Sequence, residues 1–381
     1  MPGILNGVSH RTSPARPEAT PARPTVTAMR LRTVLAAFTA CLAAATCLAA
    51  AGPANAQRNR ADGACSPSVS LDRFSDALDK TSYDGTFVGN LSALAVDLPH
   101  SRLRSSGGTP SGSLAALSDR SSLFRLDPRT LRPTGVVPLA DENGAALDSE
   151  GLVVDRDGTL LITSETEPSV RRHSPSGAIL DRLPVPAPLR VAPVGRAVTN
   201  GTFEGLTLLP GGRTLLASME YALSGDSAGT VRFQTWTRRH GDFVLGAQYA
   251  YRADAGLGVP EVQATPDGRL LVLERGFTAG VGNTVRLYLA DPRRATETSG
   301  VENLTGQDGV RPIAKTLLAD LVTCPARGAT AKQPQPNPLL DNIEGMVITG
   351  RSKGALKVLL VSDDNQNAAQ TTRFYSLRVR L

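Results

Sequence analysis

The sequence SEGLVVDRDGTLLITSE at residues 149–165 decides the fold. Two apolar, β-prone runs flank Asp157-Gly158, a dipeptide typical of the type I′ turn, because both central positions of that turn need a positive φ. Folding the chain about this dipeptide predicts a β-hairpin with Glu150 opposite Glu165. Like charges that face each other on paired strands are destabilising, so the pair needs an explanation if it recurs.

It does recur: a polar or acidic residue, an apolar run, a turn, a second apolar run and a closing acidic residue follow one another five times. The five segments begin at Asn90, Glu150, Glu204, Glu261 and Glu344. They end at Asp119, Glu165, Glu220, Glu274 and the pair Asp363-Asp364. The starting residues are 60, 54, 57 and 83 positions apart. Repeats of this length predict a β-propeller.

We expect an all-β propeller of about six blades in a single domain. A four-stranded blade fits the first three intervals, and the 83-residue interval leaves room for an extra blade or an insertion. The last repeat has three evident strands, so an N-terminal strand near 86–88 is expected to close the ring. Other short β-type runs support the all-β prediction: Thr214–Ser218, Val231–Trp236, Leu270–Leu273, Val285–Leu289, Lys357–Val361 and Phe374–Val379. Ser70–Lys80 is the one candidate for a short helix.

The ends of the five hairpins are where the acidic residues fall. In a propeller the innermost strands line the central channel, so ring symmetry is expected to gather these ends around one mouth. Several carboxylates at equivalent positions indicate a bound cation or shifted pKa values. The alternative is that each is a solvated strand end.

The N-terminal region has the features of a secretory signal peptide. Arg30 and Arg32 precede an apolar run from Val34 to Ala51, and Ala54-Asn55-Ala56 is a small-residue cleavage site. Met29 is an alternative start. We therefore divide the chain into an extension and signal peptide (1–56), an N-terminal arm (57–85) and the propeller domain (86–381), and expect an exported protein, extracellular or periplasmic.

Charge excludes some partners. The whole chain carries +6, but its first 56 residues contribute five Arg and one Glu, which leaves about +2 after cleavage. That balance argues against nucleic-acid binding. No second apolar segment of about 18 residues follows the signal, so no membrane span is expected after cleavage.

Cysteine usage fits export. Cys41 and Cys47 lie in the signal region, and Cys41 as a lipid-attachment site is a minor alternative. Cys65 and Cys324 remain, and in an exported protein they suggest one disulfide joining the N-terminal arm to the segment before the last repeat. Two free thiols are the other interpretation.

Several motifs resemble those of the phytase-like domain family, described as "esterase-like activity of phytase". They are FEGLTLLPGGRTL at 203–215, LLVLERGF at 270–277, VRLYL at 285–289, NIEGM at 342–346 and LVSDDNQN at 360–367. The resemblance covers about residues 86–381. It implies an exported β-propeller whose clustered Glu and Asp residues form the site of an ester hydrolase.

Carried over by position, the resemblance marks these residues: Glu150, Glu204, Glu220, Glu274, Arg275, Glu344, Asp363, Asp364 and Asn365. Two copies depart from the pattern. The first has Asn90-Leu91-Ser92 where an acid is expected, and the fourth has Pro260-Glu261-Val262 without the glycine. Both departures question the full symmetry of the acidic ring.

The residue types suggest chemistry on phosphate esters, phytate included. Clustered carboxylates with an Asn suit Ca²⁺, which takes six to eight oxygen ligands, and an Arg can bind a phosphate oxygen. Arg120 is a second candidate for that role. We expect these catalytic residues: Glu204, Glu220, Glu274, Arg275, Glu344 and Asp363. We expect these calcium ligands: Glu150, Glu165, Glu204, Glu344, Asp363, Asp364 and Asn365.

Two alternatives stay open for the function. One is a propeller without catalysis that binds a ligand or a protein partner and uses calcium structurally. The other is a serine carboxylesterase using Ser227, because residues 225–229 fit G-x-S-x-G. That motif needs a strand, a turn and a helix, whereas this segment reads as a polar loop before a strand. The small-molecule ester is the expected partner, and the sequence leaves the oligomeric state open.

Overall fold

The computed structural model describes residues 63–97, 112–307 and 309–381. The predicted signal peptide and extension, with Met29, Cys41 and Cys47, lie outside the described residues. The description below concerns the compact unit that residues 55–381 form.

Five antiparallel sheets of four strands each make up this unit, together with one two-stranded hairpin. Blade 1 contains β4 (Leu91–Asp97), β5 (Ser113–Ser118), β6 (Ser122–Leu126) and β7 (Pro133–Pro138). Blade 2 contains β8 (Ser149–Val154), β9 (Leu160–Ser164), β10 (Ser169–His173) and β11 (Ile179–Arg182). Blade 3 contains β12 (Phe203–Leu208), β13 (Thr214–Met219), β14 (Thr230–Arg239) and β15 (Asp242–Arg252).

The chain then completes two more blades. Blade 4 contains β16 (Gly258–Ala264), β17 (Leu270–Thr278), β18 (Gly282–Asp291) and β19 (Ala314–Asp320). Blade 5 contains β20 (Ile343–Ser352), β21 (Ala355–Ser362), β22 (Phe374–Val379) and, as its outer strand, β1 (Val69–Ser75). The described helical turns are η3 (Ala187–Leu189), η4 (Pro292–Arg294) and η5 (Leu321–Thr323).

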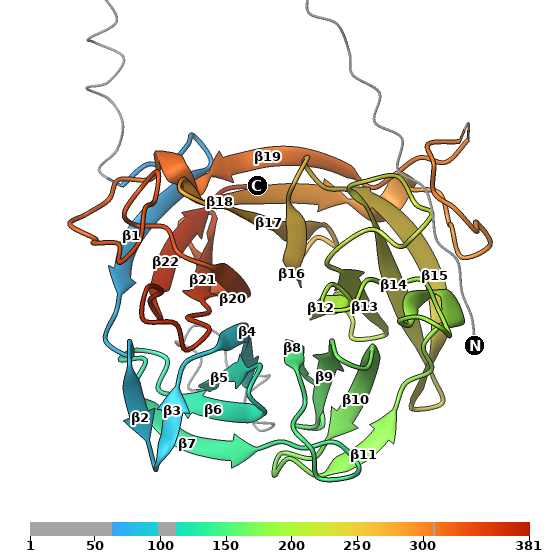
Figure 1. The fold of residues 1–381 in the computed structure, drawn as a ribbon, viewed down its shortest axis with the longest axis horizontal. Helices are drawn as coiled ribbons and strands as arrows, with labels where there is room; N and C mark the ends of the chain where they lie inside the picture. The colour runs from blue at the N-terminus through green and yellow to red at the C-terminus, as the bar shows by residue number, and fades with distance from the viewer. Residues whose placement is uncertain (1–62, 98–111, 308) are drawn as a thin grey trace, which may run out of the picture. The chain divides into compact units, whose positions relative to one another are not determined.

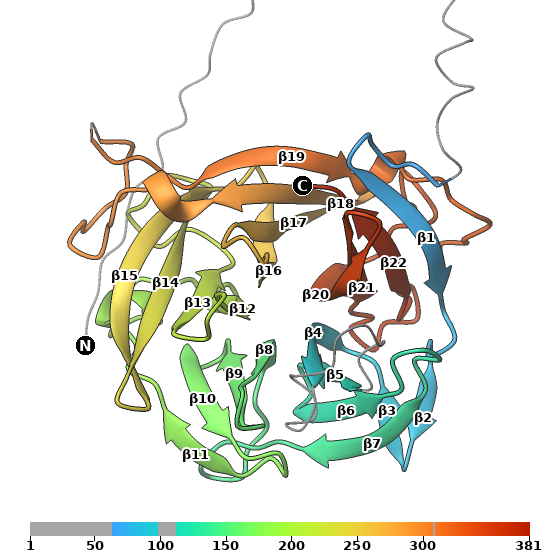
Figure 2. The ribbon, with the colours of Figure 1, turned by 180° about the vertical axis from the view of Figure 1, so that it is seen from behind.

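The inner strands β4, β8, β12, β16 and β20 surround the centre of the ring, as Figures 1 and 2 show from opposite sides. Each of them contacts the inner strand of the next blade, and β20 contacts β4, so the ring is closed. The all-β propeller expected from the sequence is therefore confirmed. Each sheet packs against two neighbouring blades, which is why strands such as β9 (LLITS) are buried on both faces and read as apolar runs.

The cores lie between the blades. Four clusters of buried apolar side chains fill the spaces between successive sheets, and the largest joins blades 2, 3 and 4 around Trp236 and Phe203. The rings of Phe203 and Trp236 meet edge to face with centroids 5.8 Å apart. Inter-blade packing thus holds the blades around the channel.

The blade count predicted from the sequence is wrong. Within the described residues there are five four-stranded sheets, and the 83-residue interval between Glu261 and Glu344 holds no extra blade. That interval contains β17–β19 and two long connections, 295–313 and 321–342. Loop length, which a repeat spacing cannot distinguish from strand content, accounts for the difference.

Two expectations about the N-terminal arm are also corrected. The strand that closes the ring is β1, which pairs antiparallel with β22 from Val69↔Val379 to Ser75↔Phe374. Thr86–Val88 is β3 and pairs with β2 (Thr81–Tyr83) in a separate hairpin. The short helix predicted over 70–80 is wrong, because hydrogen bonding to β22 and burial of Leu71 select a strand there.

A disulfide between Cys65 and Cys324 joins the segment before β1 to the end of η5, as predicted. It links residues 259 positions apart across the junction of blades 4 and 5. A structural disulfide is consistent with an oxidising compartment. Among the described residues, no helix is long and apolar enough to cross a membrane.

Candidate functional site

Each inner hairpin begins and ends at the same end of the ring. The first strand of a blade starts there, and its antiparallel partner finishes there, so the residues flanking both ends converge. This explains how acidic residues 15 or 16 positions apart, such as Glu150 and Glu165 or Glu204 and Glu220, come together.

A β-bulge lies at the start of every inner strand. The pairing register shifts between Leu91 and Ala93, Ser149 and Leu152, Phe203 and Leu206, Gly258 and Glu261, and Ile343 and Gly345. A bulge inserts a residue that the partner strand does not match and redirects its side chain. In three blades the redirected residue is a Glu: Glu150, Glu204 and Glu344.

The glycine after each of these Glu residues has a packing reason. A Cβ on Gly151 would lie 2.3 Å from the Glu204 carbonyl oxygen, and one on Gly205 would lie 2.5 Å from the Val262 nitrogen. A Cβ on Gly345 would lie 3.2 Å from the Ser92 carbonyl oxygen. The Glu-Gly pair therefore places an acid at the channel while letting the next inner strand approach closely.

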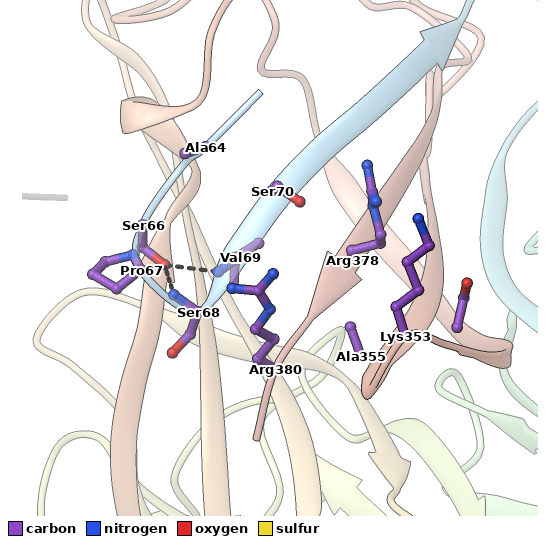
Figure 3. Close-up of a pocket in the computed structure, with 11 residues that line it drawn as sticks. Ala64, Ser66, Pro67, Ser68, Val69, Ser70, Lys353, Ala355, Arg378 and Arg380 are labelled. Carbon is purple, nitrogen blue, oxygen red and sulfur yellow. Dashed lines mark hydrogen bonds between the residues drawn. The ribbon is translucent and has the colours of Figure 1, made fainter. Parts of the chain in front are cut away.

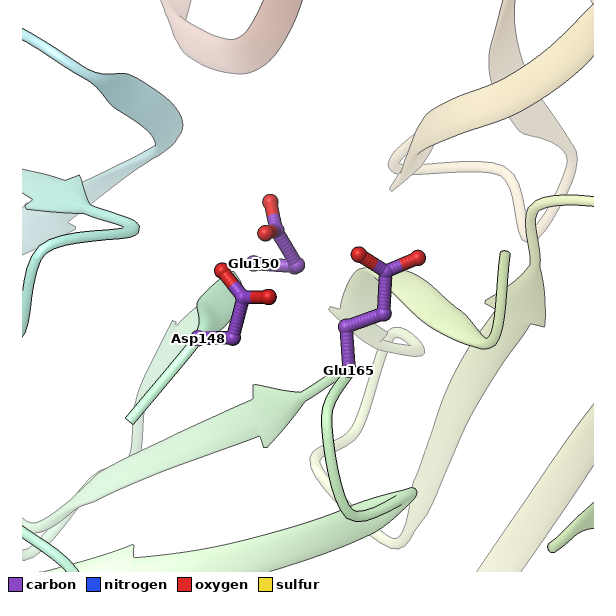
Figure 4. Close-up of side chains that lie close together, drawn as sticks. All are labelled: Asp148, Glu150 and Glu165. Atoms are coloured by element: carbon purple, nitrogen blue, oxygen red, sulfur yellow. The ribbon is translucent and has the colours of Figure 1, made fainter. Parts of the chain in front are cut away.

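Eight carboxyl groups gather at this end of the channel, and we call them the carboxylate cluster. Their members are Asp119, Asp148, Glu150, Glu165, Glu204, Glu220, Glu344 and Asp363. Two triads within it have carboxylate oxygens that lie within 4.8 Å of one another. One is Asp148, Glu150 and Glu165, whose carboxylates point toward one another in Figure 4. The other is Glu165, Glu204 and Glu220, so Glu165 belongs to both.

Arg275, within β17, supplies positive charge to the cluster. Its Nη2 lies 3.2 Å from Glu220 Oε1 and 3.0 Å from Glu344 Oε1. Asn342 Nδ2 donates to the same Glu344 oxygen at 3.0 Å. The Arg275 Nε is buried and has no hydrogen-bond partner within the described chain. One donor of the guanidinium is thus available to a ligand.

The cluster is short of positive charge, and its pKa values show the consequence. Burial raises the pKa of Glu165 to about 7, and the Glu220 carboxylate adds to this. Burial also raises the pKa of Glu344 to about 7 although Arg275 opposes the shift. The pKa values of Glu150, Glu204 and Asp363 lie well above their ordinary range, because each is buried beside other carboxylates. Burial raises that of Asp119 to about 6.

Arg275 itself stays charged. Burial alone would lower its pKa, but the surrounding carboxylates, Glu344 and Glu220 first among them, raise it. Besides Arg275, the described contacts of the cluster with a basic side chain are those of the exposed Arg120, whose Nε lies 3.5 Å from Asp119 Oδ1. Two arginines among eight carboxyl groups leave a strongly electronegative site.

Residues 86–366 match the Phytase-like family, described as esterase-like activity of phytase. The chain belongs to this family. The match spans most of the propeller and includes every member of the carboxylate cluster. Among curated protein sequences, none matches this phytase-like chain significantly.

Two solved structures resemble the phytase-like propeller at low identity. The glutaminyl cyclase of Myxococcus xanthus shares 13% identity with a TM-score of 0.42, over 82% of this chain and 96% of that one. The gluconolactonase XC5397 of Xanthomonas campestris shares 14% identity with a TM-score of 0.36, over 70% of this chain and 68% of that one. Likeness at this level carries no argument about activity.

Two predicted site residues pair with basic side chains outside the cluster. Glu274 is on the opposite face of β17 from Arg275, because successive strand residues alternate. Its carboxylate accepts from the Tyr251 hydroxyl at 2.6 Å and from the Asp254 N–H at 2.7 Å, and it pairs with Lys315. Asp364 pairs with Lys80 and accepts the Asn90 N–H at 3.0 Å.

Asn365 and Glu261 also differ from expectation. Asn365 is exposed, and its described contact is through its backbone N–H, which donates to Asp363 Oδ1 at 2.8 Å. Glu261 was expected to face Glu274, but it pairs with Leu273, because the turn has three residues, 266–268, where a two-residue turn was expected. Its buried carboxyl accepts the Val262 N–H at 2.8 Å, with the N–H groups of Leu206 and Met346 close by, and burial holds its pKa well above the ordinary range. It thus ties the inner strands of three blades.

Three residues of the site were not predicted as such. Asp148 precedes the first strand of its repeat, outside the pattern that was followed, and Asp119 was recognised as a strand end but not assigned a role. Tyr221 directly follows Glu220, and no sequence motif distinguishes this Glu-Tyr pair. Reading two residues beyond both ends of each repeat would have found Asp148 and Tyr221, whereas Asp119 already closed the first repeat.

The serine-esterase elements are not assembled. Ser227 lies in the loop before β14, so a strand follows it where a nucleophile elbow needs a helix. Among the described residues, His173 is buried with Nδ1 3.1 Å from the Gly177 carbonyl, and His240 lies in the β14–β15 turn. Neither contacts Ser227 through a hydrogen bond.

A second pocket lies at the other end of the β20–β21 hairpin in blade 5. It has a volume of about 180 Å³ and is lined by Lys353, Arg378 and Arg380 together with the serines of the segment entering β1 (Figure 3). Arg378 pairs with Asp72 at 2.6 Å. This basic pocket is separate from the carboxylate cluster, since Lys353 and Glu344 lie at opposite ends of β20 and its turn.

Proposed function

We propose that this phytase-like propeller is an exported, divalent-cation-dependent hydrolase of phosphate esters, with its site at the carboxylate cluster. The single observation that carries the proposal is the pair of carboxylate triads that share Glu165 beside Arg275. Family membership supports hydrolysis of an ester, and the disulfide supports an oxidising compartment.

The donor set fits calcium. Asp148, Glu150, Glu165, Glu204 and Glu220 offer only carboxylate oxygens, the ligands that hard cations such as Ca²⁺ prefer. Neither triad contains His or Cys, which a zinc site would use. Burial raises the pKa values of Glu165 and Glu204, and neighbouring carboxylates, Glu220 for the first and Glu150 for the second, add to the shifts. A bound cation would offset this cost of holding the groups as anions.

A bound calcium ion would neutralise the phosphoryl oxygens and orient the ester. Arg275 would bind a phosphoryl oxygen through its unpartnered Nε–H while Glu220 and Glu344 hold the guanidinium in place. Glu344, with a pKa of about 7, is suited to take a proton from water or give one to the leaving alcohol. The buried Glu261 carboxyl keeps the inner strands of blades 3, 4 and 5 in register beneath the site.

The test is release of p-nitrophenol from p-nitrophenyl phosphate by the purified chain, with calcium and with a chelator. We expect calcium-dependent release, reduced about 100-fold in Glu204→Gln. Glu302→Gln, an exposed Glu outside the cluster, is the matched control and should keep full activity. Turnover that is equal in chelator and in calcium would refute the cation-dependent mechanism.

p-Nitrophenyl acetate separates phosphate esters from carboxyl esters, because both substrates release the same phenol. Release from the acetate alone, retained in Glu204→Gln and lost in Ser227→Ala, would favour the serine carboxylesterase. No release from either, with a calcium-dependent rise in the melting temperature, would favour a propeller that binds calcium without catalysis.

A further inference from the structure

The basic pocket of blade 5 gathers cations that the described acidic residues neutralise only in part. Lys353, Arg378 and Arg380 line this pocket, and their long side chains extend to the same side in Figure 3. Asp72 pairs with Arg378 at 2.6 Å. The side chains of Lys353 and Arg380 form no ion pair with any residue that the structure describes. Three cations with one acidic partner leave the pocket positively charged.

Strand pairing extends this positive charge along one face of the sheet. Arg380 directly follows β22, two residues after Arg378, and its N–H donates to the Ser68 carbonyl at 2.8 Å, so it continues the strand. Side chains two residues apart in a strand share one face. Lys357 of β21 pairs with Arg378 and adds a fourth cation. Like charges that face each other on paired strands are destabilising, so this arrangement favours a bound anion.

A serine-rich segment forms another wall of the pocket, and its conformation is fixed. The Ser66 hydroxyl accepts the N–H of Ser68 at 3.1 Å and that of Val69 at 3.0 Å, and it donates to the Leu318 carbonyl at 2.6 Å. The disulfide of Cys65 anchors the residue before this turn. A wall that is ordered before a ligand arrives lowers the entropy cost of binding.

Hydroxyl donors accompany the cations. Ser68 and Ser70 line the pocket beside β1, and Ser352 lines it at the β20–β21 turn. All three are half-buried, and their hydroxyls form no hydrogen bond within the described part of the chain. Ammonium, guanidinium and hydroxyl groups all donate hydrogen bonds. The pocket therefore suits a ligand with several acceptor oxygens.

The size of the pocket narrows the ligand further. Its volume is about 180 Å³, whereas pockets for drug-sized ligands have roughly 300–1,000 Å³. It fits a small anion or the terminal anionic group of a larger molecule. A phosphoryl group carries a charge of about −1.5 to −2 at pH 7 and three acceptor oxygens. A carboxylate, with one charge and two oxygens, matches three cations and several hydroxyls less well.

We infer that the basic pocket binds a phosphoryl group, at a site that is separate from the carboxylate cluster and does not depend on hydrolysis there. Lys353, Arg380 and the serine hydroxyls bind its oxygens, and Arg378 adds positive charge while paired with Asp72. The source is either free phosphate or a phosphate that belongs to a longer anion. A longer anion would continue along the sheet to Lys357, the cation next to Arg378.

Isothermal titration calorimetry of the full chain with inorganic phosphate, in calcium-free buffer, tests this site. Without a cation the carboxylate cluster repels phosphate, so the heat of binding reports on the basic pocket. We expect saturable binding that weakens about tenfold in Arg380→Gln and about tenfold in Lys353→Gln. Arg294→Gln changes an exposed arginine of η4 in blade 4 and is the matched control, which should keep the affinity. No binding, or equal affinity in Arg380→Gln and the unsubstituted chain, would overturn the inference.

Two further titrations test charge and ligand class. Asp72→Asn frees Arg378 from its pair, so phosphate should bind about threefold more tightly. An unchanged or weaker affinity would contradict the charge balance on which the inference rests. Acetate should bind at least about tenfold more weakly than phosphate. Equal affinity for the two anions would overturn the assignment to a phosphoryl group.

Tripolyphosphate separates the two sources. If the pocket takes a phosphate within a longer anion, tripolyphosphate should bind at least about tenfold more tightly than phosphate, and Lys357→Gln should remove most of that difference while leaving phosphate unchanged. If free phosphate is the ligand, the two anions should bind within a few-fold of each other and Lys357→Gln should change neither. Both results support the phosphoryl site. Because no turnover is measured, these titrations and the hydrolase assay can fail independently.

Discussion

Two groups of acidic residues lie a few strands apart in this propeller, and they differ in how their charge is balanced. The carboxylate cluster has eight carboxyl groups and contacts two arginines. The second group, the Glu274 network, consists of Asp254 and Glu274 with Lys315, Arg286, Tyr251 and Tyr288. There each carboxylate has a basic partner and a phenol donor.

The difference is visible in the pKa values. Burial alone would raise that of Asp254, but Lys315, Tyr288 and Arg286 lower it to about 2. Burial raises that of Glu165 to about 7, with Glu220 adding to the shift. In the Glu274 network each carboxylate is neutralised by a basic side chain, as expected for acidic residues that stabilise a fold. The cluster keeps its acids at a cost in stability, which indicates that they are retained for a ligand.

The largest expected effect is opposite in sign for the two regions. Glu204→Gln removes one of several mutually repelling carboxylates, so it should raise the melting temperature in chelator while reducing calcium-dependent hydrolysis about 100-fold. Differential scanning calorimetry alongside the assay checks both. A lower melting temperature in chelator would mean that Glu204 is balanced by charges in the same way as Glu274.

Glu274→Gln is the matched substitution in the other region. It weakens the pair with Lys315 and a charge-assisted bond from Tyr251, so unfolding should become easier by about 2 kcal/mol with activity retained. Urea denaturation measures the stability change. A loss of hydrolysis as large as that of Glu204→Gln, without a loss of stability, would return Glu274 to the catalytic set.

The pH dependence of stability should also separate them. Glu165 and Glu344 have pKa values of about 7, above the ordinary 4.5, so the folded state holds more protons than the unfolded chain between these values. The free energy of unfolding in chelator should therefore fall as pH rises from about 4.5 to 7. Calcium should flatten this slope, whereas Glu274→Gln should leave it in place. A flat profile in chelator would contradict the charge deficit.

The smallest expected effect is that of Arg120→Ala. Its side chain is 63% exposed, and its pair with Asp119 is 3.5 Å long, so stability should change by less than about 0.5 kcal/mol. The KM for p-nitrophenyl phosphate should stay within about twofold, as kinetics with calcium would show. A KM increase of about tenfold or more would make Arg120 a second phosphate-binding residue.

The sequence predicted the propeller and the convergence of hairpin ends, because turn dipeptides and apolar runs are local signals. It missed the register by one residue in the hairpins of blades 2 and 4, because Asp157-Gly158 and Asp267-Gly268 belong to three-residue turns and not to the two-residue type I′ turn that the dipeptide predicted. For this reason Glu261 was expected to face Glu274. The bulge at the start of the inner strand then shifts the pairing by one more residue. Glu274 and Arg275 are adjacent in sequence but lie on opposite faces of β17, and only the partner strands show which face meets the channel.

The number of blades could not be predicted from the sequence for a related reason. A long connection and a blade occupy the same stretch of sequence, and only hydrogen bonding tells them apart. The compensation of Glu274 by Lys315, 41 positions away, likewise follows from which strands pair. Local patterns predicted the strands, whereas long-range strand pairing determines which acidic residue has a basic partner.

The closure of blade 5 by β1 and β22 has a consequence for biosynthesis. Glu344 and Asp363 are synthesised more than a hundred residues after the other members of the cluster. A nascent chain therefore holds an incomplete ring of acids whose repulsion is still relieved by water. The carboxylates are brought together when β1 pairs with β22 and the ring closes, so the proposed cation site is complete only in the closed ring.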